Sequence, residues 1–312
     1  MRQFLHQPVL LKETIDLLCW REGGLYVDCT LGAGGHSEAI LRECPHSRVI
    51  GIDQDKEAIE AASERLAPYG ERVIFVWRNF KNIDEILTKI GVPQVDGVLM
   101  DLGISSPQLD HKERGFSYQQ DAPLDMRMNQ VSGTITAQDI VNNLTEEELG
   151  QIIYRYGEER WAKRIAEFIV RARQEKPLTT TGELVAVVKA AIPKKVRDGG
   201  HHPAKKTFQA LRIAVNDELQ IIAPAMEAAA RRLSSGGRLA VISFHSLEDR
   251  IVKDAMRYLA KDCICPPGQA ICTCDKEQLI KPVTRKPVIA GEGELAENPR
   301  ARSAKLRVGE RV

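Results

Sequence analysis

Apolar and polar positions follow two patterns that alternate over the first hundred residues. Short apolar runs are each followed by a longer segment in which apolar residues recur every three or four positions. The apolar runs predict four strands, at Leu25–Thr30, Arg48–Asp53, Val73–Trp77 and Val95–Asp101. The longer segments predict four helices, near Val9–Trp20, Gly35–Cys44, Asp55–Ala67 and Asn82–Ile90. Strands and helices in alternation are typical of a parallel sheet with helices on both faces.

The pattern changes between residues 105 and 206, where the sequence predicts helices and no strand. Thr145–Glu148 has the Thr-x-x-Glu spacing of a helix-capping box. An amphipathic run that begins near Trp161 and the segment Thr181–Ala191 predict two further helices. This part of the chain is therefore expected to form an all-helical insert.

Strand and helix alternate again after the insert. A long helical pattern runs from Phe208 to Leu233, and Pro224 is expected to kink it because proline lacks a backbone donor. Arg238–Phe244 then predicts a buried strand, and Ser246–Leu259 predicts another helix. The simplest fold that accommodates this order is α/β, with the later strand completing the sheet begun by the first four.

Together these elements predict a doubly wound, Rossmann-like sheet interrupted by a helical domain. The sheet domain is expected to comprise residues 1–104 and 207–312, and the insert residues 105–206. Ligands of such sheets bind at the carboxyl ends of the strands. Because the insert follows the fourth strand, it is placed beside that edge, where it could hold a substrate.

A glycine turn follows the first predicted strand and indicates a nucleotide-type cofactor site. Gly32, Gly34 and Gly35 permit a tight turn and a close approach of a ligand to the backbone. Asp53, at the end of the second strand, can accept hydrogen bonds from both hydroxyls of an adenosine ribose. The last glycine of G-x-G-x-x-G is missing, and Asp28 precedes the turn. Since a carboxylate there attracts a cation and repels a pyrophosphate, the pattern favours S-adenosylmethionine over NAD. The alternative is a purely structural turn.

Composition and charge narrow the class of protein. The chain has 312 residues, of which 43% are hydrophobic, and its net charge is +1. No apolar run reaches transmembrane length, and the first residues lack the pattern of a signal peptide. We therefore expect a soluble cytoplasmic protein with no membrane partner. A nucleic-acid partner would have to be bound by local basic patches, because the overall charge gives no basic field.

Two polar side chains at predicted strand ends are candidates for chemistry. Asp101 ends the fourth strand, where its oxygens could accept the N–H groups of an exocyclic base amine and so make a delocalised nitrogen more nucleophilic. Asp101 could instead hold the cofactor, or cap the next turn. His245 follows the fifth strand and could contact RNA or relay a proton, or serve as a structural cap.

Several longer motifs resemble those of one enzyme family, the bacterial 16S ribosomal RNA cytosine-N4 methyltransferases of the MraW (RsmH) type. The motifs span almost the whole chain; they are Asp28–His36, Asp101–Asp110, Arg114–Ser117, Pro123–Arg127, Tyr156–Arg160, Thr207–Arg212, Ser243–Arg250 and Asn298–Arg302. The resemblance implies a methyltransferase that uses S-adenosylmethionine to methylate the N4 of a cytidine in the decoding centre of 16S rRNA, within the small ribosomal subunit.

The resemblance also implies a set of cofactor contacts. These are Gly34, Gly35, His36, Asp53, Phe80, Asp101 and Gln108. Other amine methyltransferases follow their acid or amide with two prolines and an aromatic residue, whereas Leu102 and Gly103 stand here. The ring that stacks on the target cytosine is therefore not assigned: Phe116 and Phe244 are candidates, and each could equally be a core residue. Methylation of an amine in DNA, and RNA binding by an assembly factor without activity, remain the rival functions, and a homodimer is left open.

Basic residues near the end of the chain are candidate RNA contacts. They are Arg300, Arg302, Lys305 and Arg307, of which the last two alternate with Leu306 and Val308 as in a strand. A second basic stretch lies at residues 194–206. In both cases the alternative is a solvated surface or, for the tail, internal ion pairs.

Four late cysteines form a separate candidate site. Cys263, Cys265, Cys272 and Cys274 could bind zinc in a structural role, although their C-x-C spacing is tighter than the usual C-x₂₋₄-C. The sequence favours the alternative, in which they bind no metal.

Overall fold

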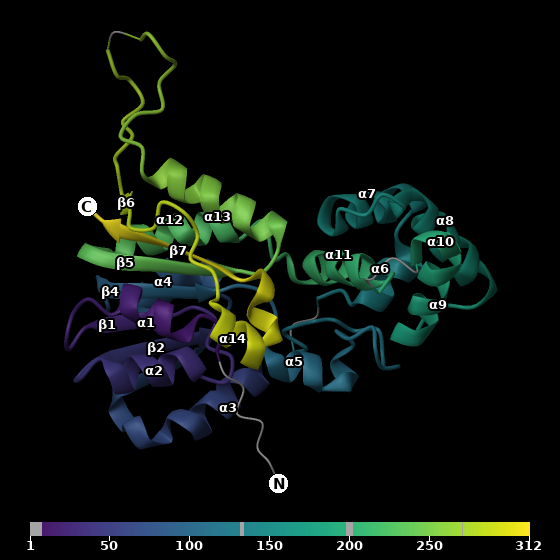
Figure 1. The fold of residues 1–312 in the computed structure, drawn as a ribbon, viewed down its shortest axis with the longest axis horizontal. Coiled ribbons are helices and arrows are strands. Elements are labelled where there is room, and N and C mark those ends of the chain that lie inside the picture. The colour runs from purple at the N-terminus through teal and green to yellow at the C-terminus, as the bar shows by residue number, and fades with distance from the viewer. Residues whose placement is uncertain (1–7, 132–133, 198–201, 270) are drawn as a thin grey trace. The chain divides into compact units, whose positions relative to one another are not determined.

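The computed structural model describes residues 8–131, 134–197, 202–269 and 271–312, which form two compact units (Figure 1). The sheet unit comprises the chain up to Gly103 and from Leu219 onward, and the helical unit comprises Ile104–Glu218. Each unit has its own apolar core. The part of the chain that the structure describes contains no helix long and apolar enough to cross a membrane.

The sheet unit is built on a seven-stranded sheet with the order β3-β2-β1-β4-β5-β7-β6. The first five strands in the chain are parallel, and the last two are antiparallel to their neighbours. The strands are β1 (Leu25–Asp28), β2 (Arg48–Asp53), β3 (Val73–Trp77), β4 (Val95–Asp101), β5 (Leu233–Ser243), β6 (Ile280–Pro282) and β7 (Lys305–Arg311). This confirms the predicted Rossmann-like sheet and adds an antiparallel end.

Helices cover both faces of the sheet. Those of one face are α1 (Leu11–Leu18), α2 (Gly35–Glu43) and α3 (Lys56–Leu66), and their apolar residues share one core with Tyr26, Leu99 and Leu306 of the strands. On the other face α12 (Ile222–Arg232) packs against α4 (Ile83–Lys89) and α13 (Ser246–Leu259) (Figure 1). A short helix, α14 (Glu292–Glu297), precedes β7.

The helical unit consists of short helices around a core of its own. They are α5 (Ser106–Asp110), α6 (Ala137–Asn143), α7 (Glu146–Gly157), α8 (Ala162–Glu175), α9 (Thr181–Ala191), α10 (Lys194–Arg197) and α11 (Lys205–Asn216). The predicted capping box at Thr145 and Glu148 begins α7. Gly157 ends α7 where a Cβ would lie 2.6 Å from the carbonyl oxygen of Lys206, so this glycine lets α7 and α11 pack closely.

The predicted long helix from Phe208 to Leu233 is wrong. Asp217 adopts a left-handed backbone conformation, with φ 51°, and ends α11. The second half of the pattern forms α12, and Pro224 lies in the first turn of this helix rather than at a kink. The backbone N–H groups of a first turn have no partner within the helix, so a proline there costs no helical hydrogen bond. The two compact units therefore separate at Glu218 rather than at Lys206, and α11 belongs to the helical unit.

Candidate functional site

Acidic side chains gather at the carboxyl ends of the parallel strands. Asp28 ends β1, Asp53 ends β2 and Asp101 ends β4, while Glu248 lies in the first turn of α13, which follows β5. Burial raises the pKa of Asp28 to about 6 and the pKa of Asp53 to about 6. Burial, and then the charges of Asp28 and Glu248, raise the pKa of Asp101 well above its ordinary range. A cationic ligand would relieve this repulsion, whereas a further anion would increase it.

The glycine turn between β1 and α2 has the geometry that only glycine tolerates. Gly32 and Gly34 have φ of 50° and 78°. A Cβ on Gly34 would lie 3.2 Å from Leu66 of α3, and one on Gly35 would lie 2.4 Å from the ring of Pro8. Packing of the chain against itself therefore already requires these glycines, and contact of Gly34 and Gly35 with the cofactor stays a prediction.

Asp53 ties the glycine turn to the end of β2. One carboxylate oxygen accepts the N–H of Gly32 and the other accepts the N–H of Asp55, each at 2.9 Å. A carboxylate oxygen can accept a second hydrogen bond, so the group could still bind two ribose hydroxyls. Its position fits the predicted ribose contact.

His36 connects the turn with Asp101. Its Nε2 lies 3.1 Å from the carbonyl oxygen of Val9, and its Nδ1 lies 3.6 Å from Oδ2 of Asp101. Donation from Nε2–H to Val9 would leave Nδ1 of the neutral ring as an acceptor facing the Asp101 carboxyl. At 3.6 Å this contact is longer than a hydrogen bond, so the imidazole, of which only 6% is exposed, packs beside Asp101.

Asp101 carries an unsatisfied acceptor. Its backbone N–H donates to the hydroxyl oxygen of Thr30 at 2.7 Å, which fixes the end of β4. Its Oδ1 is buried and has no hydrogen-bond partner among the described residues. Buried polar atoms are nearly always paired in native proteins, so an unpaired carboxyl oxygen at a strand end points to an absent donor. An amine or ammonium group of a ligand would supply that donor.

His245 caps α13. Its Nδ1 accepts the backbone N–H of Glu248 at 3.4 Å, and the Glu248 carboxylate in turn accepts the N–H of Phe244 at 2.7 Å. Nε2 of His245 lies 3.1 Å from Oε1 of Glu248. The structure thus gives His245 the structural role that was one of its two predicted roles. Glu248 was not among the predicted site residues, although its spacing from His245 is that of a capping box.

The remaining aromatic and amide candidates lie in different surroundings. Phe80 begins a 3₁₀ turn, Phe80–Asn82, shortly after β3 and is half-buried, and its contact with adenine stays a prediction. Phe116 is buried in the core of the helical unit, and Phe244 packs partly buried against the sheet core. Gln108 lies in the helical unit, where its side-chain oxygen accepts the N–H of Ser105 at 3.1 Å. The ring that stacks on a target base therefore remains unassigned.

Two of the four predicted RNA contacts in the tail form internal ion pairs. Lys305 and Arg307 lie on β7, and both reach the carboxylate of Asp249 on α13, at 2.9 and 2.8 Å. Leu306 and Val308 point into the core, as their alternation predicted. Arg300 and Arg302 are exposed on a 3₁₀ turn, Pro299–Ser303. The second predicted basic stretch falls partly outside the described residues, at 198–201.

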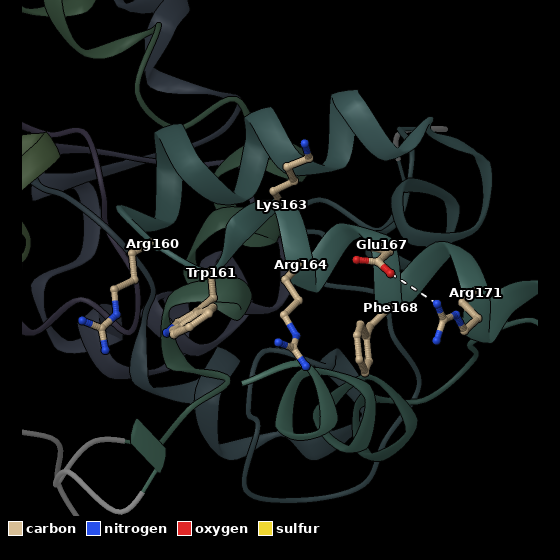
Figure 2. A pocket seen from close by; sticks show the side chains of 7 residues that line it. All are labelled: Arg160, Trp161, Lys163, Arg164, Glu167, Phe168 and Arg171. Carbon is tan, nitrogen blue, oxygen red and sulfur yellow. Dashed lines mark hydrogen bonds and ion pairs between the residues drawn. The ribbon is translucent and has the colours of Figure 1, made fainter. Parts of the chain in front are cut away.

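The helical unit carries a basic and aromatic surface that was not predicted from the sequence. We call it the α8 face; the residues that line its hollow are Arg160, Trp161, Lys163, Arg164, Glu167, Phe168 and Arg171. Figure 2 shows most of these side chains on one side of the helix, with Lys163 pointing away. Its signal in the sequence is the spacing of arginine and aromatic residues at intervals of three and four, a set that shares Trp161 with the predicted apolar stripe.

Arginine guanidinium groups lie over the rings of the α8 face. Arg160 is 5.6 Å from the centre of the Trp161 ring, and Arg164 and Arg171 are 5.3 and 5.6 Å from that of Phe168. Both rings also pack against the helical core. Stacking leaves the N–H donors at the edge of a guanidinium group accessible, and Arg171 uses one of them to pair with Glu167 at 3.2 Å. The surface could therefore bind phosphates chiefly through Arg160 and Arg164.

Comparisons with known proteins agree with the resemblance seen in the sequence. The model of the MraW methylase family matches residues 3–312. A ribosomal RNA small subunit methyltransferase H of Clostridioides difficile strain 630 is 56% identical over 311 residues, which are 99% of this chain and 100% of the relative. Proteins of the same name from Symbiobacterium thermophilum and Geotalea uraniireducens are 55% identical over 305 residues (97% of this chain, 96% of the relative) and 54% identical over 313 residues (100% of both). The predicted family and methyltransferase fold are confirmed, and with them S-adenosylmethionine as the methyl donor.

Proposed function

Because this chain belongs to the MraW methylase family, we propose that it methylates the exocyclic N4 of a cytidine in the decoding centre of 16S rRNA. The substrate would be the small ribosomal subunit, as the names of its relatives indicate for them. The observation that carries the proposal is the unpaired, buried Oδ1 of Asp101 at the end of β4. It supplies the acceptor that an exocyclic amine needs.

The acid-rich strand ends fit the donor. S-adenosylmethionine supplies an electrophilic methyl group on a positively charged sulfur, together with an ammonium group. Asp28, Asp53 and Asp101 would hold this cation, with Asp53 accepting the ribose hydroxyls and Phe80 flanking the adenine. Burial and mutual repulsion raise the pKa values of the three carboxyls, and a bound positive charge would stabilise their ionised forms and lower these pKa values.

Asp101 would also act on the amine. Its free oxygen can accept an N–H of the cytosine, which localises the nitrogen lone pair and stabilises the positive charge that develops as the N–C bond forms. The methylated nitrogen must then lose a proton, and a carboxyl whose pKa is raised is a suitable acceptor. His36, whose Nε2 lies 3.1 Å from the carbonyl oxygen of Val9, packs beside this carboxyl.

We assign RNA binding to the helical unit and the tail. The α8 face presents Arg160, Arg164 and the Glu167-paired Arg171 beside two aromatic rings, a combination that suits phosphates and unstacked bases. Arg300 and Arg302 are the exposed cations of the tail. We assign Lys305 and Arg307 a role in stability rather than in RNA binding, because both form ion pairs with Asp249.

The test is methyl transfer from labelled S-adenosylmethionine to small subunits, naked 16S rRNA and DNA. The product should be N4-methylcytidine in the small-subunit RNA, identified by mass spectrometry of nucleosides and located by nuclease mapping. Asp101→Ala should abolish turnover at saturating donor, and the matched control Asp84→Asn, which changes an exposed carboxylate on α4, should not. Label in DNA, or in another atom of the RNA, would refute the proposal.

A further inference from the structure

The segment between α13 and β6 is a long loop without an apolar core. Its described residues, 261–269 and 271–278, contain neither helix nor strand, and most of their side chains are exposed. In Figure 1 the loop projects from the sheet unit beyond the end of α13. Long segments of this kind need another source of order if they are to hold one conformation.

Four cysteine sulfurs meet in this loop. The Sγ atoms of Cys263, Cys265, Cys272 and Cys274 all lie within 4.8 Å of one another. Cys272 lies 3.7 Å from Cys263, 3.8 Å from Cys265 and 3.5 Å from Cys274, and Cys274 lies 3.8 Å from Cys263. A disulfide requires about 2.05 Å, so these thiols are not paired covalently. Four sulfurs around a tetrahedral ion at about 2.3 Å would be about 3.8 Å apart, which agrees with these separations.

The backbone repeats one contact in both C-x-C pairs. The N–H of Ile264, between the first two cysteines, donates to Sγ of Cys274 at 3.3 Å. The N–H of Thr273, between the second two, donates to Sγ of Cys265 at 3.4 Å. Each pair thus supports the last sulfur of the other, in a two-fold arrangement. Backbone donors aimed at sulfur stabilise thiolates, the form in which cysteine binds metals.

We propose that Cys263, Cys265, Cys272 and Cys274 bind one zinc ion in a tetrahedral, four-thiolate site that orders this loop. Zinc takes four thiolates readily and has no redox chemistry of its own. All four positions would be filled by protein sulfur, so the site has no open position for a substrate and is structural. The tight spacing that made the sequence signal weak is explained by the reciprocal contacts, because each bridging residue turns its N–H toward the opposite pair.

Metal content tests the site directly. The full-length protein, purified under reducing conditions without chelators, should contain about one zinc ion per chain by elemental mass spectrometry. The double variant Cys263→Ser, Cys274→Ser should contain no zinc. The matched control is Cys19→Ala, which removes a thiol of the sheet unit outside the cluster and should keep the metal. Replacement by Co²⁺ should give the intense visible bands of a tetrahedral thiolate complex in the wild type and the control only.

A second readout follows the loop itself rather than activity. Trypsin should cut after Lys261 and Lys276 much faster in the double variant, or after metal removal from the wild type, and added Zn²⁺ should protect only the wild type. The proposal would be overturned if the protein, purified without chelators, contained no metal and its four thiols reacted rapidly with an alkylating agent. A mass that shows two disulfides in the native protein, or iron in place of zinc, would overturn it as well.

Discussion

Removal of the Arg307 side chain should destabilise the sheet unit without weakening contact with RNA. Arg307 and Asp249 are 13% and 14% exposed, and Nε lies 2.8 Å from Oδ1. A hydrogen bond between charged groups in such partial burial contributes about 1.5–3 kcal/mol. Lys305 binds the same carboxylate but is 40% exposed, so solvent should reduce its contribution to below about 1 kcal/mol. We therefore expect Arg307→Ala to lower the free energy of unfolding by about 2 kcal/mol, and Lys305→Ala by less than half of that.

The assay combines urea unfolding with hydrogen exchange of the peptide that contains β7. Both should report weaker pairing of β7 in Arg307→Ala, while Arg302→Ala, at an exposed position, should change stability by less than about 0.5 kcal/mol. Asp249→Asn should remove most of the Arg307 effect in a double-mutant cycle. An unchanged free energy of unfolding, together with a salt slope of RNA binding reduced by about one unit, would refute this reasoning and make Arg307 a phosphate contact.

The same ion pairs predict a pH dependence. Although burial opposes ionisation of Asp249, the hydrogen bonds from Arg307 and Lys305 hold its pKa below its ordinary value. A carboxyl with a lowered folded pKa stabilises the protein above its unfolded pKa of about 3.9, and this contribution is lost as the pH falls through the folded value. The difference in stability between wild type and Asp249→Asn should therefore be constant above about pH 5 and shrink in more acidic solution.

The remaining predictions concern the donor and RNA. Asp53→Ala should weaken S-adenosylmethionine binding by about 10- to 100-fold in calorimetry, since charge-assisted hydrogen bonds are lost; unchanged affinity in a folded variant would remove Asp53 from the site. Because burial raises the pKa values of Asp28 and Asp53 to about 6, donor affinity should fall between pH 7.5 and 5.5 as these carboxyls gain protons, and a flat profile would contradict their role. Arg164→Ala with Phe168→Ala should weaken RNA binding and lower its salt slope by about one unit, with unchanged donor affinity; equal RNA affinity would exclude the α8 face.

The sequence predicted the elements whose signal is local. β2, β3 and β4 have the predicted bounds, and α13 begins and ends where its apolar period does. The break between α11 and α12 could not be predicted, because Asp217 is neither glycine nor proline and its left-handed conformation interrupts an otherwise continuous apolar period.

The candidate site was predicted only in part: the acids at the strand ends were predicted from the sequence, and the contacts made by α13 were not. The strand ends placed Asp28, Asp53 and Asp101 at one edge of the sheet, because a parallel topology brings such ends together. Sequence could not show that Glu248 adds a fourth acid, or that Asp249 engages Lys305 and Arg307, since both depend on how α13 lies against the sheet. The spacing of charged side chains along a sequence does not show which of them will pair. Only the fold shows whether a given cation forms an internal ion pair.

The interruption of the sheet unit has a consequence for the order of folding. β4 and β5 are neighbours in the middle of the sheet, and Asp101 pairs with Ile242, yet the whole helical unit lies between them in the chain. Closing so long a loop costs entropy before any contact of this strand pair forms. The helical unit has local contacts and a core of its own, so it can become compact first and shorten the effective connection. Its early formation would then guide the central strands together, and variants that weaken its core should slow the assembly of the sheet.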